Sequence, residues 1–158
     1  MTEVATQVTF AEAIARALAA EGATDVFGIM GSGNMGVLHH LEHDLEVAYH
    51  PARHEAGAVA AADGFSRATG RIGVCIVTQG PGLTNTITPL ITARKANSPV
   101  VLLTGDSSGI VTPDDPFARV QAVSYETLLA AADVPVVRGE RRRRRATCTR
   151  PSRRPLAI

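Results

Sequence analysis

The sequence predicts an α/β domain, a three-layer sandwich in which helices cover both faces of a mainly parallel sheet. Short apolar segments rich in Val, Ile and Leu alternate along the chain with longer segments of helical periodicity. The 158 residues are enough for one domain with a buried core. The composition is 45% hydrophobic but only 4% aromatic, which is typical of domains built on aliphatic side chains. Because strand–helix–strand units of this length place their strands side by side in one direction, we expect a parallel sheet.

A capping box predicts the start of the first helix. In Thr9-Phe10-Ala11-Glu12 the Thr9 hydroxyl can bond a backbone N–H of the first turn, and Glu12 stands three residues later. Apolar residues then recur at helical spacing, and Gly22 is a favourable position for the helix to end.

The remaining elements follow from apolar runs and from the glycines and prolines between them. Strands are predicted at 26–29, 45–49, 72–78, 99–104 and 134–137. Helices are predicted through Leu38 and Leu41 and at 55–70, 83–96 and 125–132. The segment after Gly105-Asp106 is predicted to be a loop, with a turn at 113–116.

The loop after the first strand carries a glycine pattern, Gly31-x-Gly33-x-x-Gly36. This spacing between a strand and a helix is that of dinucleotide-binding loops, whose backbone N–H groups approach a pyrophosphate at a helix N-terminus. In those domains an acidic residue closes the second strand about 20 residues later and holds a ribose hydroxyl. Here the second strand continues into Tyr49-His50-Pro51 instead. A nicotinamide or flavin role is therefore poorly supported, and a glycine-rich turn explains the same residues.

Other groups of reactive side chains give weaker indications. His39 and His43 share a helix face, but no further ligands are evident that would complete a metal site. The two cysteines do not form a disulfide framework, and Cys75 stands in an apolar strand. No Gly-x-Ser-x-Gly elbow and no phosphate-loop lysine are present. With no apolar run near the ~20 residues that span a bilayer, and no leader pattern, we expect a cytoplasmic protein.

The most informative segment is the predicted helix that starts at Glu55. Small residues fill the run from Ala56 to Ala62, which indicates close packing against neighbouring elements. Glu55 stands in the first turn, where the positive end of the helix dipole favours a carboxylate. On position alone, Glu55 therefore has an ordinary stabilising role.

Three motifs in order change this interpretation. They are Arg53-His54-Glu55-x-Gly57-Ala58 with Ala62-Asp63-Gly64-Phe65-Ser66-Arg67-Ala68-Thr69-Gly70, then Thr78-Gln79-Gly80-Pro81-Gly82-Leu83-Thr84-Asn85, then Ser98-Pro99-Val100-Val101-Leu102-Leu103-Thr104-Gly105. The chain from about Thr9 to Val137 resembles the N-terminal pyrimidine-binding domain of the thiamine-diphosphate enzymes of the acetolactate synthase, pyruvate oxidase and benzoylformate decarboxylase group. The resemblance implies one domain over residues 1–137, and it assigns the Gly31-Ser32 loop to an active site.

The resemblance implies a catalytic role for Glu55. In the group, the matching glutamate hydrogen-bonds N1′ of the cofactor's aminopyrimidine and promotes the tautomer whose 4′-nitrogen takes the proton from C2. The activated cofactor then attacks the carbonyl of a small 2-oxo acid. The cofactor-binding residues implied for this chain are Gly31, Ser32, Glu55, Thr78, Gln79, Gly80, Pro81, Gly82 and Asn85. No metal ligand is implied within the chain.

Some positions depart from the pattern of the group. Ala56 stands where acetolactate synthases usually have Gln, and Gly31-Ser32 is similar to the pair in benzoylformate decarboxylase. Those decarboxylases, however, have an acid–base histidine where this chain has Thr78. The substrate and the second reaction step therefore stay open, and synthase or lyase chemistry without a catalytic histidine is the better match.

The second half of the expected cofactor site is not encoded in this sequence. The group holds the diphosphate through Mg²⁺ in a separate domain marked by Gly-Asp-Gly and a later Asn, and no such motif occurs here. Because the pyrimidine domain of one subunit faces the diphosphate domain of another, the resemblance implies a homo- or hetero-oligomer and a chain that is inactive alone. Some relatives bind FAD in a further domain, and nothing here supports a flavin site.

The C-terminal residues differ in character from the domain before them. From Arg138 to Ile158 there are nine arginines and one acid, whereas the preceding residues hold seven basic residues against fourteen acids. Residues 138–158 are expected to be a disordered tail, and their lack of periodicity favours a truncated enzyme read in a shifted frame. An alternative is a natural small subunit of a two-chain, sulfopyruvate-type 2-oxo acid decarboxylase. A weaker alternative is nucleic-acid binding through the arginines, which lack interleaved aromatic residues.

Overall fold

The structure, a computed structural model, describes residues 8–106 and 116–139 and is centred on one sheet. The four strands have the order β2-β1-β3-β4, and each neighbouring pair is parallel. The strands are β1 (Asp25–Gly28), β2 (Ala48–Pro51), β3 (Gly73–Ile76) and β4 (Val100–Leu103). The predicted α/β class is therefore confirmed.

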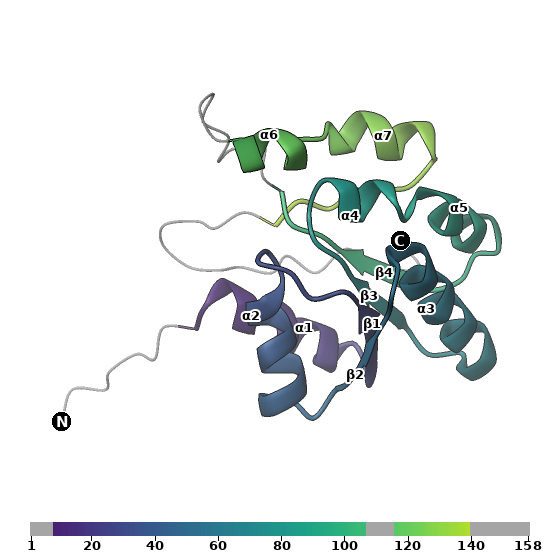
Figure 1. Ribbon diagram of the computed structural model, residues 1–158. Helices are drawn as coiled ribbons and strands as arrows, with labels where there is room; N and C mark the ends of the chain where they lie inside the picture. The colour runs from purple at the N-terminus through teal and green to yellow at the C-terminus, as the bar shows by residue number, and fades with distance from the viewer. Residues whose placement is uncertain (1–7, 107–115, 140–158) are drawn as a thin grey trace.

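Helices cover both faces of this sheet, as Figure 1 shows. They are α1 (Phe10–Ala20), α2 (Met35–His39), η1 (His40–Asp44), α3 (Glu55–Thr69), α4 (Pro81–Thr84), α5 (Ile87–Lys95), α6 (Pro116–Gln121) and α7 (Tyr125–Ala131). The first three pack on one face, and α3, α4, α5 and α7 pack on the other. η1 is a short π-helix that continues α2. None of the described helices is long and apolar enough to cross a membrane.

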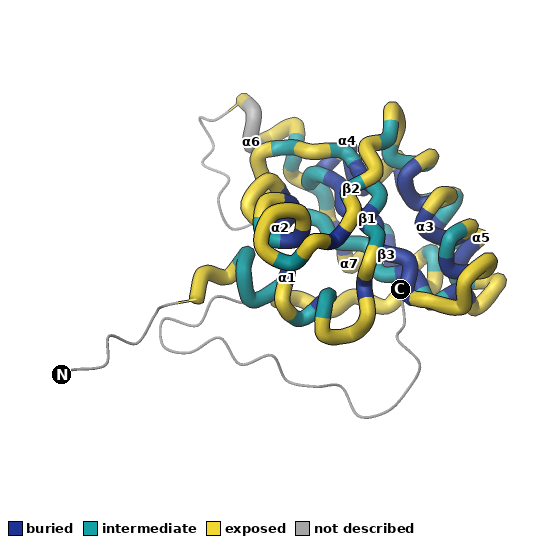
Figure 2. Tube along the Cα trace, turned by 90° about the horizontal axis from the view of Figure 1, so that it is seen from below, coloured by how far each residue is buried: buried dark blue, intermediate teal, exposed yellow. Residues whose placement is uncertain are grey.

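Each face of the sheet has its own hydrophobic core. Consecutive residues of β3 alternate between the two cores: Val74 and Ile76 contact the α1 side, and Cys75 contacts the α3 side. All three are almost completely buried. Figure 2 shows buried positions along the strands and along the inner sides of α3 and α5. A strand covered on both faces needs apolar residues at every position, which is why it reads as a continuous apolar run.

α3 packs closely on β3 because that strand begins with glycine. A Cβ added to Gly73 would lie 2.2 Å from the carbonyl oxygen of Ala62. The helix begins after its N-cap His54, whose Nδ1 accepts a hydrogen bond from the Ala56 N–H at 3.1 Å. It ends at Gly70, which has the left-handed conformation (φ 69°) that favours glycine. Both ends of α3 are therefore capped.

An ion pair on α3 makes a pH-dependent contribution to stability. Arg67 donates two hydrogen bonds to Asp63, from Nε to Oδ1 at 2.8 Å and from Nη2 to Oδ2 at 2.7 Å, and Asp63 is 8% exposed. Burial raises the pKa of Asp63, but the hydrogen bonds from Arg67, the interaction with Ser98 and the charge of Arg67 together outweigh burial and leave that pKa below its ordinary value of 3.8. A lowered folded-state pKa means that the stabilisation is present above the ordinary pKa and is lost as pH falls through the folded-state pKa.

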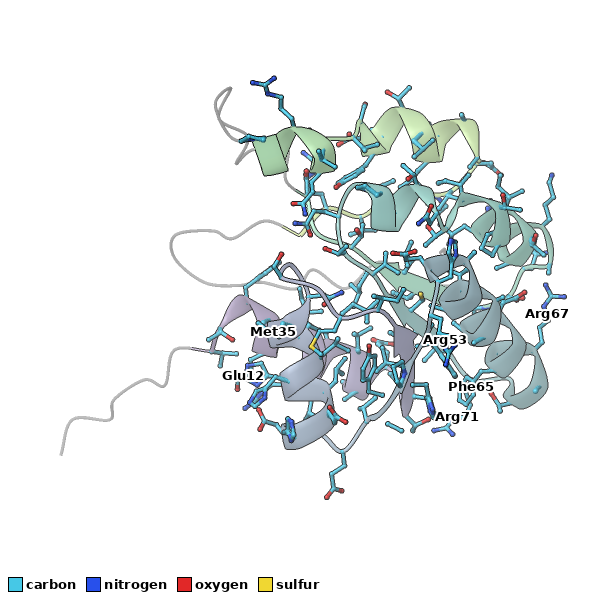
Figure 3. The ribbon with its side chains drawn as sticks, viewed as in Figure 1. Glu12, Met35, Arg53, Phe65, Arg67 and Arg71 are labelled. Carbon is cyan, nitrogen blue, oxygen red and sulfur yellow. The ribbon has the colours of Figure 1, made fainter. Side chains whose placement is uncertain are left out.

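We expect Asp63→Asn to lower the free energy of unfolding at neutral pH by about 1–2 kcal/mol, because it removes the charge from a doubly hydrogen-bonded pair. The deficit should shrink as pH falls below 3.8. Chemical denaturation of the wild-type chain and of Asp63→Asn, at neutral pH and at about pH 3.5, measures this difference in unfolding free energy. Glu12→Gln is the control, because Glu12 pairs with the exposed Arg16 on the opposite side of the molecule (Figure 3) and should cost almost nothing. An Asp63→Asn deficit that is equal at both pH values would contradict this account.

The helix predicted at 83–96 is in fact two helices, α4 and α5. Thr86 interrupts it, because its hydroxyl donates to the Leu83 carbonyl at 2.6 Å in place of a regular helical bond. Pro89, in the first turn of α5, has no N–H with which to continue the preceding ladder.

The second strand begins at Ala48 rather than at Leu45. The Val47 N–H donates to the Leu41 carbonyl at 2.8 Å, and Glu46 has a positive φ of 55°. Residues 45–47, predicted as the start of the strand, therefore form the turn that follows η1 and are not part of β2.

The C-terminal part of the described chain contains two further differences from the prediction. No strand forms at 134–137, because the Val134 N–H closes the end of α7 on the Leu129 carbonyl at 2.9 Å and Pro135 has no donor for a ladder. Residues 116–121, predicted as loop, form α6. Most of the predicted turn at 113–116, and the arginine tail after Gly139, lie outside the described residues.

Candidate functional site

The carboxyl edge of the sheet contains a topological switch point. β1 has β2 on one side and β3 on the other, so the chain leaves the sheet in opposite directions after β1 and after β3. The two loops that follow, 29–34 and 77–80, lie outside the strand ends at this edge, which is the usual ligand position in open parallel sheets. Both loops contain predicted site residues, and they lie at the same end of the sheet (Figure 1).

Asn34 shapes the loop after β1. It is 3% exposed, its Oδ1 accepts a hydrogen bond from the Gly31 N–H at 2.8 Å, and its Nδ2 donates to the Ile29 carbonyl at 3.0 Å. These bonds bring Gly31 against the next loop, where an added Cβ would lie 3.0 Å from Cβ of Thr78. Ser32 is exposed on the same loop. The close contact between the two loops therefore depends on the missing side chain at position 31.

The side chain of Gln79 joins three loops. Its Oε1 accepts a hydrogen bond from Oγ1 of Thr78 at 2.9 Å, and its Nε2 donates to Oε1 of Gln121 at 2.8 Å. Gly33 and Gly105 flank the same amide, since a Cβ on either would lie 2.3 or 2.9 Å from its oxygen. The glycine pattern after β1 thus makes room for a protein side chain in this structure.

Glu55 and Asn85 form the second polar group of the site. Glu55 is half-buried at the start of α3, and Nδ2 of Asn85 donates to its Oε2 at 2.9 Å. The other carboxylate oxygen, Oε1, lies 3.7 Å from the position that a Cβ would take on Gly82, and that position is 3.0 Å from Cγ2 of Thr78. Within the described part of the chain, Asn85 is the only hydrogen-bond partner of this carboxylate. Oε1 therefore lies beside Gly82, which has no side chain.

The charge of Glu55 contributes to the pKa of the Cys75 thiol, but Cys75 is not a candidate nucleophile. It is fully buried in β3. Burial, with a smaller contribution from the Glu55 carboxylate, raises the pKa of the thiol to about 12. Since the thiolate is the reactive form, Cys75 has the apolar role that its strand predicts.

The structure brings together most of the predicted site residues. Contacts link Gly31, Glu55, Thr78, Gln79, Gly82 and Asn85, while Gly80 and Pro81 form the turn that begins α4. Ser32 is hydrogen-bonded to none of these. Asn34, Gln121 and Tyr125, whose hydroxyl accepts a hydrogen bond from the Gly80 N–H at 3.1 Å, contact the site but were not predicted from the sequence. An asparagine after glycines is a recognisable turn signal, but the other two lie in a segment without a motif.

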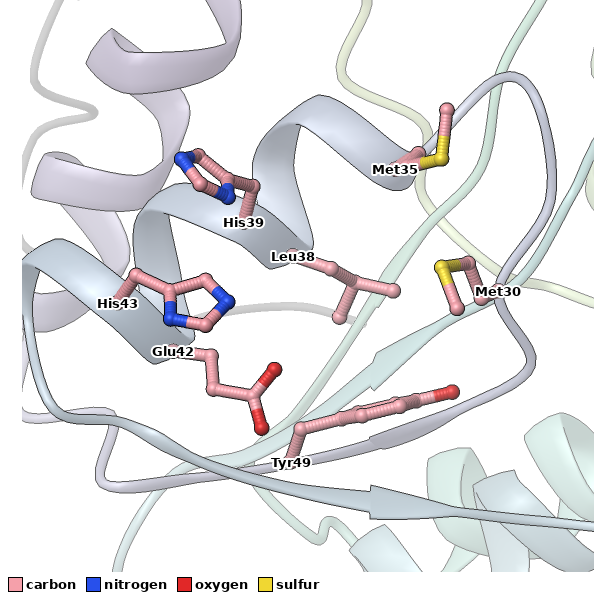
Figure 4. Close-up of a pocket in the computed structure, with 7 residues that line it drawn as sticks. All are labelled: Met30, Met35, Leu38, His39, Glu42, His43 and Tyr49. Carbon is pink, nitrogen blue, oxygen red and sulfur yellow. The ribbon is translucent and has the colours of Figure 1, made fainter.

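A separate pocket lies beside the loop after β1 (Figure 4). It has a volume of about 210 Å³ and is lined by Met30, Met35, Leu38, His39, Glu42, His43 and Tyr49. The rings of His39 and His43 are 4.9 Å apart, so they share a helix face as predicted. Among the residues that the structure describes, no three His, Cys, Asp or Glu side chains are grouped so that they could hold a metal ion. The pocket does not include Glu55 or the loop after β3.

The fold and the candidate site define an open parallel α/β domain with a group of polar side chains at its switch point. The group contains a half-buried carboxylate, an amide that donates to it and adjoining glycine turns. Residues 8–120 match the family model of the thiamine pyrophosphate enzyme N-terminal TPP-binding domain. The chain therefore belongs to this family.

Relatives with assigned names agree with this membership. The chain is 42% identical over 113 residues to the "Probable acetolactate synthase large subunit" of Methanocaldococcus jannaschii, covering 72% of this chain and 19% of that protein. It is 43% identical over 113 residues to the acetolactate synthase isozyme 2 large subunit of Escherichia coli, covering 72% and 20%. The chain thus spans about a fifth of the length of these relatives.

A solved structure resembles the chain in three dimensions as well. It is described as the "X-ray structure of a putative thiamin diphosphate-dependent enzyme isolated from Mycobacterium smegmatis". The TM-score is 0.59 at 29% identity, and the match covers 70% of this chain and 21% of the other. The similarity in fold therefore lies in the same small share of a longer protein.

Proposed function

We propose that this chain forms the aminopyrimidine half of a thiamine diphosphate site in an acetolactate synthase-like enzyme that acts on 2-oxo acids. The observation that supports this most strongly is the Glu55–Asn85 pair at the carboxyl edge of the sheet, with Oε1 of Glu55 on the side of Gly82. The family membership gives the cofactor class, and the named relatives give the enzyme class.

The residues present fit this cofactor. An aminopyrimidine carries basic ring nitrogens, and a carboxyl group is the side chain that can both hold and exchange a proton with such a nitrogen. Glu55 offers Oε1 for this purpose, because Asn85 occupies Oε2. Thr78, Gln79 and the turn from Gly80 to Gly82 would form the adjoining wall, and Gly31 and Ser32 would lie across from it. Mg²⁺ would be held elsewhere, by the part of the enzyme that binds the diphosphate.

When bound, thiamine diphosphate supplies a carbon nucleophile and the electron sink that decarboxylation of a 2-oxo acid requires. Glu55 holds a proton at Oε1 and passes it to and from the pyrimidine ring. Asn85 fixes the rotation of the carboxyl group by donating to Oε2. The positive end of α3 favours the ionised carboxylate after each transfer. The Glu55 carboxyl group is thus oriented through Oε2, and Oε1 is left for the cofactor.

The substrate class follows from the relatives and from one residue of this chain. Thr78 stands in the wall of the site next to Gln79, and its hydroxyl cannot act as an acid–base group near neutral pH as a histidine can. A synthase or lyase step that needs no catalytic histidine is therefore the better match. The 2-oxo acid itself is left open by these residues.

The chain is proposed to be inactive by itself, because its groups contact only one end of the cofactor. The 113 residues that match are only about a fifth of the length of the relatives. A diphosphate-binding domain or subunit would complete the site, in a homo- or hetero-oligomer. Whether that partner belongs to a large subunit of the acetolactate synthase type, or is the separate chain of a two-chain decarboxylase, is the question that the next experiment answers.

We expect the purified 158-residue chain, supplied with thiamine diphosphate, Mg²⁺ and pyruvate, to release no carbon dioxide above the background. Adding a polypeptide that carries the diphosphate-binding region of an acetolactate synthase should produce turnover and acetolactate. Carbon dioxide release with acetaldehyde instead would favour the decarboxylase alternative. Turnover by the chain alone, or a complex that retains no thiamine diphosphate, would contradict the proposal.

A further inference from the structure

A tyrosine from outside the recognised motifs reaches the turn that follows β3. The hydroxyl oxygen of Tyr125, the first residue of α7, accepts a hydrogen bond from the Gly80 N–H at 3.1 Å. The bond is buried, and Tyr125 is only 6% exposed. A second contact holds the same turn from α6, since Gln79 donates to Gln121 at the end of that helix. The turn is therefore held by side chains from about 40 residues further along the chain.

The Gly80 turn controls the position of Asn85. Gly80 is the N-cap of α4, and its carbonyl accepts the Thr84 N–H at 3.1 Å. The Asn85 N–H in turn donates to the Pro81 carbonyl at 3.1 Å. With only one helical turn between them, a rotation of the peptide at Gly80 is transmitted to Asn85 and so to its hydrogen bond with Glu55.

The Tyr125 ring contributes to a common core with the elements that carry both members of the pair. It packs in the cluster that contains Ala58 and Val59 of α3 and Leu83 of α4. The ring therefore lies in the same core as the first turns of α3, while the hydroxyl bonds the N–H of the residue that precedes α4. Glu55 is the first residue of α3 and Asn85 directly follows α4, so Tyr125 is linked to both elements that carry the pair.

We infer that Tyr125 is a positioning residue of the site: its hydroxyl fixes the Gly80 turn and thereby holds Asn85 against the Glu55 carboxylate. This inference rests on the proposed function for its meaning, since the Glu55 carboxylate is the group proposed to exchange a proton with the cofactor. Its geometry can be tested without any cofactor.

The test uses the full chain, labelled with ¹⁵N and ¹³C, in the wild-type form and as Tyr125→Phe. The variant keeps the ring and removes only the acceptor oxygen. We expect hydrogen exchange at the Gly80 N–H to accelerate roughly tenfold or more, because that N–H loses its partner. We also expect the side-chain amide resonances of Asn85 to shift and their nuclear Overhauser contact with the Glu55 side chain to weaken, while the amide signals of β1 and β3 stay in place.

Tyr49→Phe is a matched control, because Tyr49 is the other tyrosine of the chain and its hydroxyl also bonds a backbone group, the Gly28 carbonyl at 3.2 Å. It should leave the Asn85 signals unchanged. A Tyr125→Phe spectrum in which Asn85 and Glu55 remain in contact would overturn the inference, as would equal effects of the two variants. If Tyr125→Phe does not fold, the wild-type chain decides: a Gly80 N–H that exchanges as fast as an exposed amide overturns the inference, and a protected one supports it.

This result and that of the partner experiment are independent. Loss of the Asn85–Glu55 contact in Tyr125→Phe with no cofactor retention in the completed enzyme would support the geometry and refute the proposed function. The reverse pattern would refute the positioning role alone.

Discussion

Replacing Glu55 by Gln in a complete enzyme that contains this domain should lower kcat by about 100-fold or more, which is the usual contribution of a positioned acid–base group. A glutamine has the same shape as the glutamate and can still accept the hydrogen bond from Asn85 through its amide oxygen. It cannot exchange a proton with a ring nitrogen. The loss should therefore fall on turnover, while the affinity for the cofactor changes much less.

The position of Glu55 allows an effect on catalysis to be separated from an effect on stability. The residue is half-buried and makes its hydrogen bond with a side chain, so the substitution should leave the fold intact. Thermal unfolding of the isolated chain checks this, and the midpoint should move by no more than a few degrees, as for a change of about 1 kcal/mol or less. Glu21→Gln, at the exposed end of α1, is the control and should leave kcat unchanged. Full activity of the Glu55→Gln enzyme would refute the catalytic assignment.

The fold could be predicted because its signals are local. Aliphatic runs between glycines and prolines give β1, β3 and β4, and helical spacing with a cap gives α1. The errors occur where a local bond overrides the pattern. The hydrogen bond of the Thr86 hydroxyl divides one predicted helix into two. The Val134 N–H donates to the end of α7, so it cannot donate to a neighbouring strand.

The site was predictable only in part, for a different physical reason. Glu55, Asn85 and the Gly80 turn stand in motifs whose residue types carry the chemistry. Tyr125 instead acts through a contact across 45 positions in sequence, and such contacts leave no periodic or compositional signal. Gln79 is a similar case, because its place among Gly33, Gly105 and Gln121 depends on three loops that only the sheet order brings together.

Replacing Gly80 by Ala should destabilise the chain by about 3 kcal/mol, for two reasons that add. Gly80 has φ 66° and ψ −117°, a backbone conformation that costs other residues about 1–3 kcal/mol. In addition, a Cβ at this position would lie 2.6 Å from Cα of Gln121 and 2.9 Å from its carbonyl oxygen. Because the obstacle is backbone rather than a mobile side chain, α6 has to move away. Thermal unfolding should show a midpoint lower by roughly 10 °C for a domain of this size.

The matched control is Gly64→Ala, in the middle of α3. A Cβ on Gly64 would meet no atom within 4 Å, and its conformation is helical, so the alanine should stabilise the helix by about 0.5–1 kcal/mol. The same change from glycine to alanine should therefore lower the unfolding temperature at position 80 and raise it at position 64. If Gly80→Ala unfolds at the wild-type temperature, the turn is not held against α6 as the structure has it. If it is destabilised as expected, the Asn85–Glu55 contact should be lost with it, since α4 begins at Gly80 and ends beside Asn85.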